Sequence, residues 1–380
     1  MVRLKGITWG HSRGFTSVVA TAQRFVERHP EVDIQWEKRS LQTFADGDLA
    51  TLAQRYDLLV IDHPWAGFAA EKAILLPLQQ HLPPEFLADQ AAHSVGGSHE
   101  SYLFNGVQTA LAIDAATPIA VYRPDHLAEE RFRLPESWDD LVLLAKQGRV
   151  IYAGIPINAL MDFLMLCATR GGTWFNGEQI ADRETAIEAL EAQRELASHC
   201  SESIFNADPI AIHEKLSSED RWSYCPFAYG YSNYSRPGYA RYLLKATDVV
   251  SYHGNPLKTV LGGTGLAISA RCPHRDIALE YARFTASAEV QKRLFFENGG
   301  QPGHRAAWLD EEVNRRSQHF FADTLATLDR SAKRPRYNGF LNFQDHAGDL
   351  VRDYVMHGGS AQTTFEKMNQ LYQKSLNIAE

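Results

Sequence analysis

The chain has 380 residues, a length that favours two domains over a single compact core. Apolar residues make up 44% and charged residues 22%, as in an ordinary soluble globular protein. The net charge of −8 argues against a nucleic-acid-binding face, which needs basic charge, and no apolar run approaches the roughly 20 residues that span a bilayer.

The first sixty residues predict alternating strands and helices. Residues 5–9 are strand-like, residues 18–26 carry a helical apolar stripe, and residues 32–36 alternate between apolar and polar. A short helix is expected around residues 49–53. Residues 58–61 are continuously apolar, as in a central parallel strand covered on both faces. This order builds an open, doubly wound sheet.

The middle of the chain predicts a second α/β unit. Extended segments are expected over 102–122, and the break at 115–118 is interpreted as the first crossing between two lobes. Ser137-Trp138-Asp139-Asp140 is a capping-box pattern ahead of a helix. The later elements expected are a strand over 149–155, a helix over 158–169, a charged and solvent-facing helix over 183–199, a strand over 222–227, and helices over 320–328, 347–356 and 363–376.

The four cysteines are Cys167, Cys200, Cys225 and Cys272. They are widely spaced and form neither a C-x-x-C motif nor a zinc-ligand pattern. We expect buried thiols rather than metal ligands, and the spacing leaves a single disulfide open.

Two glycine-rich segments mark the last part of the chain. Residues 261–269 read LGGTGLAIS, interpreted as a tight turn with positive φ that runs into a short strand, and residues 299–304 read GGQPGH. Between them Ile277, Tyr281 and Phe284 fall at helical spacing, and Ser287 is placed to cap a second helix. No Lys-Ser/Thr pair follows the first glycines, so we expect no nucleotide site.

This order of turn, strand, helices and loop resembles the family 1 extracellular solute-binding proteins, the ligand-capturing subunits of carbohydrate ABC importers. The resemblance implies a two-lobed α/β fold of the type II periplasmic-binding-protein-like class. Each lobe would be an open, mostly parallel sheet flanked by helices, joined by a hinge of several crossings. Lobe 1 would comprise residues 1–115 plus 264–306, and lobe 2 residues 116–263 plus 307–380.

The same resemblance implies a binding protein and not an enzyme, with no cofactor and no metal. It implies a carbohydrate-like ligand (a sugar, polyol or sugar acid), ABC permease subunits as partners, a monomer, and a periplasmic or extracellular location. Met1-Val2-Arg3 leads directly into the first expected strand without a hydrophobic leader, so the export route stays open.

The candidate site follows from the rule that ligands bind beyond the carboxyl ends of strands in open α/β sheets. Aromatic faces stack on the C–H faces of a pyranose, while Arg, amide and carboxylate groups bind its hydroxyls. The strand ends supply His11, Ser12, Arg13, Asp62, His63, Trp65, Asn158, Tyr229, Tyr231 and Asn233. The resemblance adds Gly263 and Thr264 at the return crossing, and Gln301 and His304 in a loop that borders the cleft in the family.

Each candidate also has a structural interpretation. The tyrosines are equally compatible with packed surface, and Trp65 with a core position. Asp62 is suited to cap the next helix, since a short carboxylate accepts from free backbone N–H groups. Arg13 is suited to pair with a carboxylate, and His11 and His63 to structural roles.

The main competing interpretation is a serine hydrolase. Gly10-His11-Ser12-Arg13-Gly14 matches the G-x-S-x-G nucleophile elbow, between an expected strand and an expected helix. Only eleven residues precede Ser12, however, and no His-Gly-Gly-Gly segment exists for an oxyanion loop. A metal- or anion-binding receptor of the same fold, using Tyr229 and Tyr231, is a second alternative. Paired acids that would suit a glycosidase lie at expected helix caps or exposed faces.

Overall fold

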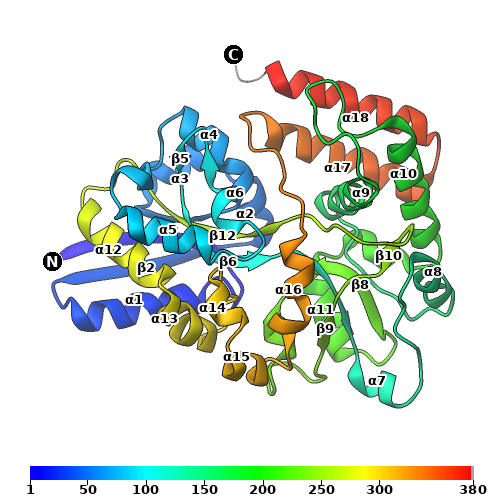
Figure 1. The fold of residues 1–380 in the computed structure, drawn as a ribbon, viewed down its shortest axis with the longest axis horizontal. Coiled ribbons are helices and arrows are strands. Elements are labelled where there is room, and N and C mark those ends of the chain that lie inside the picture. The colour runs from blue at the N-terminus through cyan, green and yellow to red at the C-terminus, as the bar shows by residue number, and fades with distance from the viewer. Residues whose placement is uncertain (378–380) are drawn as a thin grey trace. The chain divides into compact units, whose positions relative to one another are not determined.

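The computed structural model describes residues 1–377, with the side chains of residues 42, 45 and 46 outside that description. The chain divides into two compact units (Figure 1). Unit 1 comprises Met1–Ala116, Gly262–Arg315 and Arg336–Asn338, and unit 2 comprises Thr117–Leu261, Arg316–Pro335 and the residues from Gly339 onward. Residues 307–315 and 336–338, which the sequence prediction placed in lobe 2, thus pack with unit 1. The assignment of functional lobes stays a prediction.

Unit 1 is built on a five-stranded sheet with the order β2-β1-β3-β12-β6. Its strands are β1 (Val2–Trp9), β2 (Val32–Arg39), β3 (Leu58–Ile61), β6 (Leu111–Ala116) and β12 (Gly262–Ile268). β1 pairs in parallel with β2 and β3, whereas β12 is antiparallel to both β3 and β6. β6 therefore runs in the direction of β1, so four strands share one direction, as predicted for this lobe.

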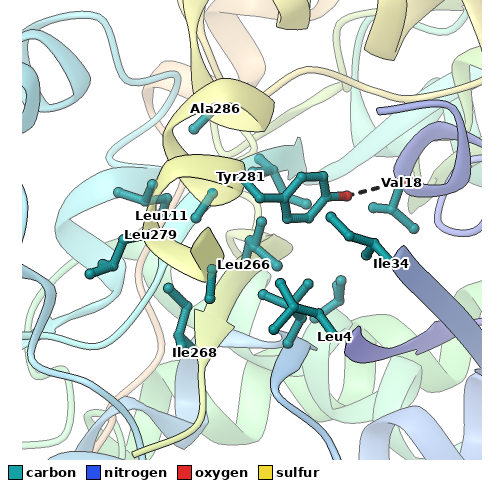
Figure 2. Packing of buried hydrophobic residues seen from close by; sticks show 14 of the residues in the cluster. Leu4, Val18, Ile34, Leu111, Leu266, Ile268, Leu279, Tyr281 and Ala286 are labelled. Atoms are coloured by element: carbon teal, nitrogen blue, oxygen red, sulfur yellow. Dashed lines mark hydrogen bonds between the residues drawn. The ribbon is translucent and has the colours of Figure 1, made fainter. Parts of the chain in front are cut away.

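One core cluster of unit 1 lies between this sheet and the helices α1 (Thr16–Arg28) and α12 (Arg275–Ala286), and a second cluster includes the alternate strand residues Leu59 and Ile61. Figure 2 shows Leu4 and Leu266 of the sheet beside Val18 of α1 and Tyr281 of α12. The Tyr281 hydroxyl donates to the Val18 carbonyl oxygen at 3.1 Å, which joins the two helices inside the core. Burial raises the pKa of Tyr281 to about 12, so this hydroxyl keeps its proton.

The remaining elements of unit 1 are short. They are α2 (Leu41–Asp46), α3 (Leu49–Arg55), η1 (His63–Trp65), α4 (Ala66–Glu71), η2 (Leu78–Gln80), α5 (Pro84–Ala92), α6 (Ser98–Ser101), β4 (Leu103–Phe104), β5 (Val107–Gln108), α13 (Ala288–Val290), the π-helical turn η5 (Gln291–Phe295), α14 (Arg305–Trp308) and α15 (Glu311–Arg316). Ser287 holds the predicted N-cap position of α13, but its hydroxyl donates backwards to Phe284 instead of capping.

Unit 2 has a three-stranded sheet with the order β8-β7-β9, formed by β7 (Pro118–Tyr122), β8 (Tyr224–Tyr229) and β9 (Lys245–Thr247). Both pairs are antiparallel, which corrects the expected mostly parallel sheet. The expected strand over 149–155 is reduced to one parallel bridge between Val150 and Tyr224. Its ladder stops because the N–H of Gly154 donates to Ile204, outside the sheet.

Helices make up most of the rest of unit 2. They are α7 (Pro124–Ala128), α8 (Trp138–Lys146), α9 (Pro156–Arg170), α10 (Arg183–Ser198), η3 (Glu202–Asn206), α11 (Pro209–Ser218), η4 (Ser232–Ser235), α16 (Phe320–Asp329), α17 (Phe340–His357) and α18 (Ala361–Leu376), with a hairpin of β10 (Ser251–Tyr252) and β11 (Asn255–Pro256). The capping box at Ser137 and Asp140 is confirmed. The prediction that α10 faces solvent is wrong for one side of the helix, because alanine and leucine residues between its charged residues form a buried stripe.

The first glycine-rich segment is part of a strand and not a turn. β12 begins at Gly262 and carries a bulge between Thr264 and Gly265 in its pairing with β6. The predicted positive φ occurs at Gly263, where φ is 96°. A Cβ at this position would lie 2.4 Å from the carbonyl oxygen of Asp114, so both the backbone conformation and the close strand approach require glycine.

The four cysteines are free thiols in this structure, and three of them, Cys167, Cys225 and Cys272, are buried. Over residues 1–377, no helix combines the length and the apolar character that crossing a bilayer demands.

Candidate functional site

The turn after β1 positions the first group of candidates. Arg13 is 4% exposed, and its Nε donates to Asp114 Oδ2 at 2.8 Å while Nη2 lies 2.5 Å from Oδ1. Gly14 is required here because a Cβ would overlap the indole of Trp9 at 2.3 Å. The suggested carboxylate partner for Arg13 therefore exists, but it is buried on β6 rather than at the surface.

Asp114 is a functional candidate that the sequence prediction missed. Burial raises the pKa of its carboxyl, while the Arg13 guanidinium and the N–H of Thr264 act in the opposite direction. The signal was a single carboxylate inside an otherwise apolar strand, Leu111-Ala112-Ile113-Asp114-Ala115-Ala116. A charge in such a strand requires a buried partner, so the pattern indicates an ion pair or a site.

Thr264 lies directly opposite Asp114 in the ladder between β12 and β6. Its side chain is 5% exposed, and its hydroxyl has no hydrogen-bond partner in the structure. Gln301 is also buried beside this ladder, where its amide donates to the Ala115 carbonyl oxygen at 2.8 Å. The sheet thus brings together Arg13, Thr264 and Gln301 of the predicted set around Asp114.

The candidates after β3 adopt the structural roles suggested as alternatives. Asp62 caps η1, accepting from the N–H of His63 at 2.8 Å. His63 is fully buried, and its ring lies edge-on to Tyr102. Trp65 is half-buried and packs against Phe68, with ring centroids 5.5 Å apart. Ligand contact by these residues stays a prediction.

His11 and Ser12 bear on the hydrolase alternative. The Nδ1 atom of His11 accepts the N–H of Arg13 at 3.0 Å, so this nitrogen is engaged with the backbone. Ser12 is half-buried, and its backbone does not adopt the positive φ of a strained elbow. The strand-turn-helix context of the motif is present, but its characteristic nucleophile conformation is not.

In unit 2, Asn158 lies in the first turn of α9 and is 6% exposed. Its Oδ1 has no hydrogen-bond partner in the structure. One turn later Asp162 is also buried, with an unpartnered Oδ2, and burial raises its pKa well above the usual value. Asp162 was not predicted, although a lone carboxylate in the run Leu160-Met161-Asp162-Phe163-Leu164 was a visible signal.

The segment after β8 is an aromatic cluster. Tyr231 is 4% exposed and meets His213 edge-on, with ring centroids 5.6 Å apart. Tyr234 stacks on the same imidazole, and its hydroxyl donates to Glu214 at 2.6 Å. Asn233 is buried in η4, whereas Tyr229, at the end of β8, is half-buried. Of the two predicted tyrosines, Tyr229 is thus the more exposed.

His304 lies apart from the Asp114 group. Its side chain is buried against Asp89 and stacks on His93. Burial lowers the pKa of His304, an effect that Asp89 opposes and His93 supports. Gln301 and His304, which the sequence prediction treated as one loop, therefore face different neighbours.

The chain belongs to the bacterial extracellular solute-binding proteins, whose family model matches residues 9–197. This match confirms the predicted family, although it lies outside the glycine-rich segments at residues 261–269 and 299–304. The family is a solute-binding family, as the sequence predicted.

Solved structures agree over nearly the whole length. The chain resembles maltose-bound MalE3 of T. maritima with a TM-score of 0.84 and 16% identity, over 98% of this chain and 100% of that one. It also resembles an ABC transporter solute-binding protein of Agrobacterium radiobacter K84 in complex with ribitol, with a TM-score of 0.82 and 17% identity over 98% of each chain. A third similar structure is an ABC transporter solute-binding protein of Agrobacterium vitis S4 with bound D-mannitol. Its TM-score is 0.78 and its identity 13%, over 100% of this chain and 99% of that one. This likeness confirms the predicted fold class of two-lobed binding proteins.

Proposed function

We propose that the protein is a receptor that captures a small carbohydrate-like ligand, a sugar, polyol or sugar acid, and delivers it to an ABC-type importer. The observation that carries the proposal is the gathering of Arg13, Asp114 and Thr264 at the carboxyl edge of the unit 1 sheet, in a chain of a solute-binding family. Ligands of open α/β sheets bind at this edge.

The chemistry of the candidate residues suits a polyhydroxylated ligand. Thr264 Oγ1 and Asn158 Oδ1 are buried and without a partner, and hydroxyl groups are able to satisfy both. Half-buried Trp65 and Tyr229 offer aromatic faces for the C–H face of a sugar ring. Maltose, ribitol and D-mannitol, the ligands of the similar structures, are all of this class.

The mechanism that we propose is hinge closure. Ligand docks on one lobe, contacts from the other lobe favour the closed form, and the population shifts towards it. Moving the equilibrium from mostly open to mostly closed requires a preference of about 5 kcal/mol for the closed form. A micromolar dissociation constant corresponds to about 8 kcal/mol, so the ligand supplies enough free energy. The permease would recognise the loaded protein by the changed relation of the lobe surfaces.

The family description supports a periplasmic or extracellular location. We further propose that permease subunits of an ABC importer are the partners and that the receptor is a monomer. These statements extend the proposal and are testable separately, by fractionation, by transport in a deletion strain and by light scattering.

The experiment that tests the proposal is a thermal-shift screen of the purified protein against sugars, polyols and sugar acids, followed by calorimetry. A ligand that binds only the folded state adds roughly 2.7 kcal/mol of stability at a hundredfold excess over its dissociation constant. We expect a shift from one carbohydrate class, abolished in a variant with Arg13 replaced. A shift only from amino acids or inorganic anions would reject the carbohydrate class. Turnover of an ester that depends on Ser12 would reject the receptor itself.

A further inference from the structure

We propose that Asp89, His93 and His304 form a binding site for one divalent transition-metal ion of the Zn²⁺ type in unit 1. Asp89 lies in the last turn of α5, His93 is the C-cap of that helix, and His304 is the N-cap of α14. One ligand atom from each residue lies within 4.8 Å of the other two. The inference is independent of the carbohydrate proposal.

The present distances are close to those of a metal centre. Asp89 connects both imidazoles, with Oδ1 2.8 Å from His93 Nδ1 and Oδ2 3.4 Å from His304 Nε2. Around a tetrahedral Zn²⁺ with bonds of about 2.0–2.1 Å, neighbouring ligand atoms are about 3.4 Å apart. The three ligand atoms lie within 4.8 Å of one another, so side-chain rotation would have to close the longest separation by about 1.4 Å to surround one ion.

The backbone holds the two histidine segments together. The N–H of Arg305 donates to the His93 carbonyl oxygen at 2.7 Å, and Ser94 forms an antiparallel bridge with His304. The Arg305 side chain adds a bond from Nε to the Ser94 carbonyl oxygen at 3.2 Å. Two ligands that are distant in sequence are thus fixed side by side before any ion binds, which reduces the entropy lost on binding.

One of the three proposed ligands is buried and the other two are exposed, as a site that is accessible from solvent requires. The side chain of His304 is 4% exposed, whereas those of Asp89 and His93 are 47% and 53% exposed. The ion can therefore reach the buried imidazole from solvent, and water can complete the coordination.

The donor set selects the class of ion. Two imidazoles and one carboxylate suit Zn²⁺, Cu²⁺, Ni²⁺ or Co²⁺, whereas Mg²⁺ and Ca²⁺ prefer oxygen ligands only. Two bonds oppose binding through these atoms. His93 Nδ1 donates to the Asp89 carbonyl oxygen at 3.1 Å, and His304 Nδ1 accepts the N–H of Ala306 at 3.2 Å. A metal on Nε2 requires the proton on Nδ1, so this capping bond is lost. We therefore expect micromolar rather than nanomolar affinity.

The site would connect α5 to the segment that supports the candidate ligand residues. Just before His304, the N–H of Gly303 donates to the Ile113 carbonyl oxygen. The backbone of Pro302 forms an antiparallel β-bridge with Asp114 of β6. A bound ion would fix the start of α14 and, through this backbone pairing, add stability to the edge of the sheet that holds Asp114.

The test uses the full chain without a polyhistidine tag, stripped with EDTA and titrated with ZnCl₂ by calorimetry and thermal melting. We expect one equivalent to bind and the melting temperature to rise, with no effect of MgCl₂. His93→Ala and Asp89→Asn should each weaken binding at least tenfold. His81→Ala, which removes an exposed histidine of the same unit, is the matched control and should change nothing. Tetrahedral Co²⁺ would give an intense visible d–d band that His93→Ala removes.

Equal Zn²⁺ affinity in the wild type, His93→Ala and Asp89→Asn would overturn the proposal, and so would the absence of saturable binding. His93 and Asp89 are more than two-fifths exposed, so both variants should fold, and a cooperative melt checks this directly. If a carbohydrate raises the melting temperature and Zn²⁺ does not, only the metal site is rejected. If Zn²⁺ raises it and no carbohydrate does, only the carbohydrate class is rejected.

Discussion

Arg13 and Asp114 form a buried ion pair across the edge of the unit 1 sheet, with guanidinium nitrogens 2.5 and 2.8 Å from the two carboxylate oxygens. Their side chains are 4% and 0% exposed. Because neither charge is solvated, each depends on the other. Breaking such a pair from one side leaves an uncompensated buried charge.

We therefore expect Arg13→Ala to reduce the free energy of unfolding by about 3–5 kcal/mol. Urea denaturation would measure this loss. The control is Arg3→Ala, which breaks the pair with Asp33 at the protein surface, where the Arg3 side chain is 62% exposed. Such exposed pairs contribute about 0–1 kcal/mol. Equal effects of the two substitutions would show that Arg13 is not buried against Asp114.

Gly263→Ala should destabilise unit 1 for two reasons. The residue has a φ of 96°, and an added Cβ would lie 2.4 Å from the carbonyl oxygen of Asp114. Gly106→Ala is a matched control, because its φ is 80° but no atom lies within 4 Å of the added carbon. We expect about 1 kcal/mol for the control, from the backbone conformation alone. Chemical denaturation should show that Gly263→Ala lowers the free energy of unfolding at least twice as much as Gly106→Ala.

Asp162 should make stability depend on pH in a defined direction. Burial raises its folded-state pKa well above the usual value of 3.8. A raised acid pKa means that the folded state holds its proton more tightly, so this contribution is complete below the unfolded pKa. It is lost as pH rises from about 4 towards the folded pKa. Asp162→Asn should remove this loss, so its unfolding free energy should fall less than that of the wild type between pH 4 and pH 8.

The control for this pH series is Asp182, whose pKa is shifted the other way. The Thr173 hydroxyl and N–H donate to its carboxylate and lower its pKa. Its contribution is present above the unfolded pKa and is lost as pH falls. Asp182→Asn should therefore lower the free energy of unfolding mainly at neutral pH. The same sign of pH dependence in both variants would contradict the burial of Asp162.

The sequence predicted the elements whose signal is local. Residues 58–61 form β3 as expected, because four consecutive apolar residues suit a strand covered on both faces. The strand expected over 149–155 failed because its apolar residues carry no information on where the Gly154 N–H donates. The candidate site was predictable only in part. Arg13 was on the list, but its partner lies 101 residues away, and no local pattern connects the two.

Trp65→Ala tests the aromatic part of the proposed site. The indole is half-buried and packs against Phe68, so we expect a moderate loss of stability. If Trp65 also stacks on the sugar, affinity should fall at least tenfold, because a ring face that covers C–H groups dominates such contacts. Calorimetry with the ligand found in the screen measures this. Phe68→Ala should weaken the same packing without changing affinity, which separates the two roles.

Asn158→Leu separates stability from function most clearly. Because its buried Oδ1 has no partner in the structure, the amide contributes little to folding, and an apolar side chain of similar size should leave stability unchanged or higher. If this oxygen accepts from a ligand hydroxyl, the same change should weaken binding by tenfold or more. Asp162→Asn, one turn further along α9, is the control and should leave affinity unchanged. A variant that is both less stable and equally tight in binding would assign Asn158 a purely structural role.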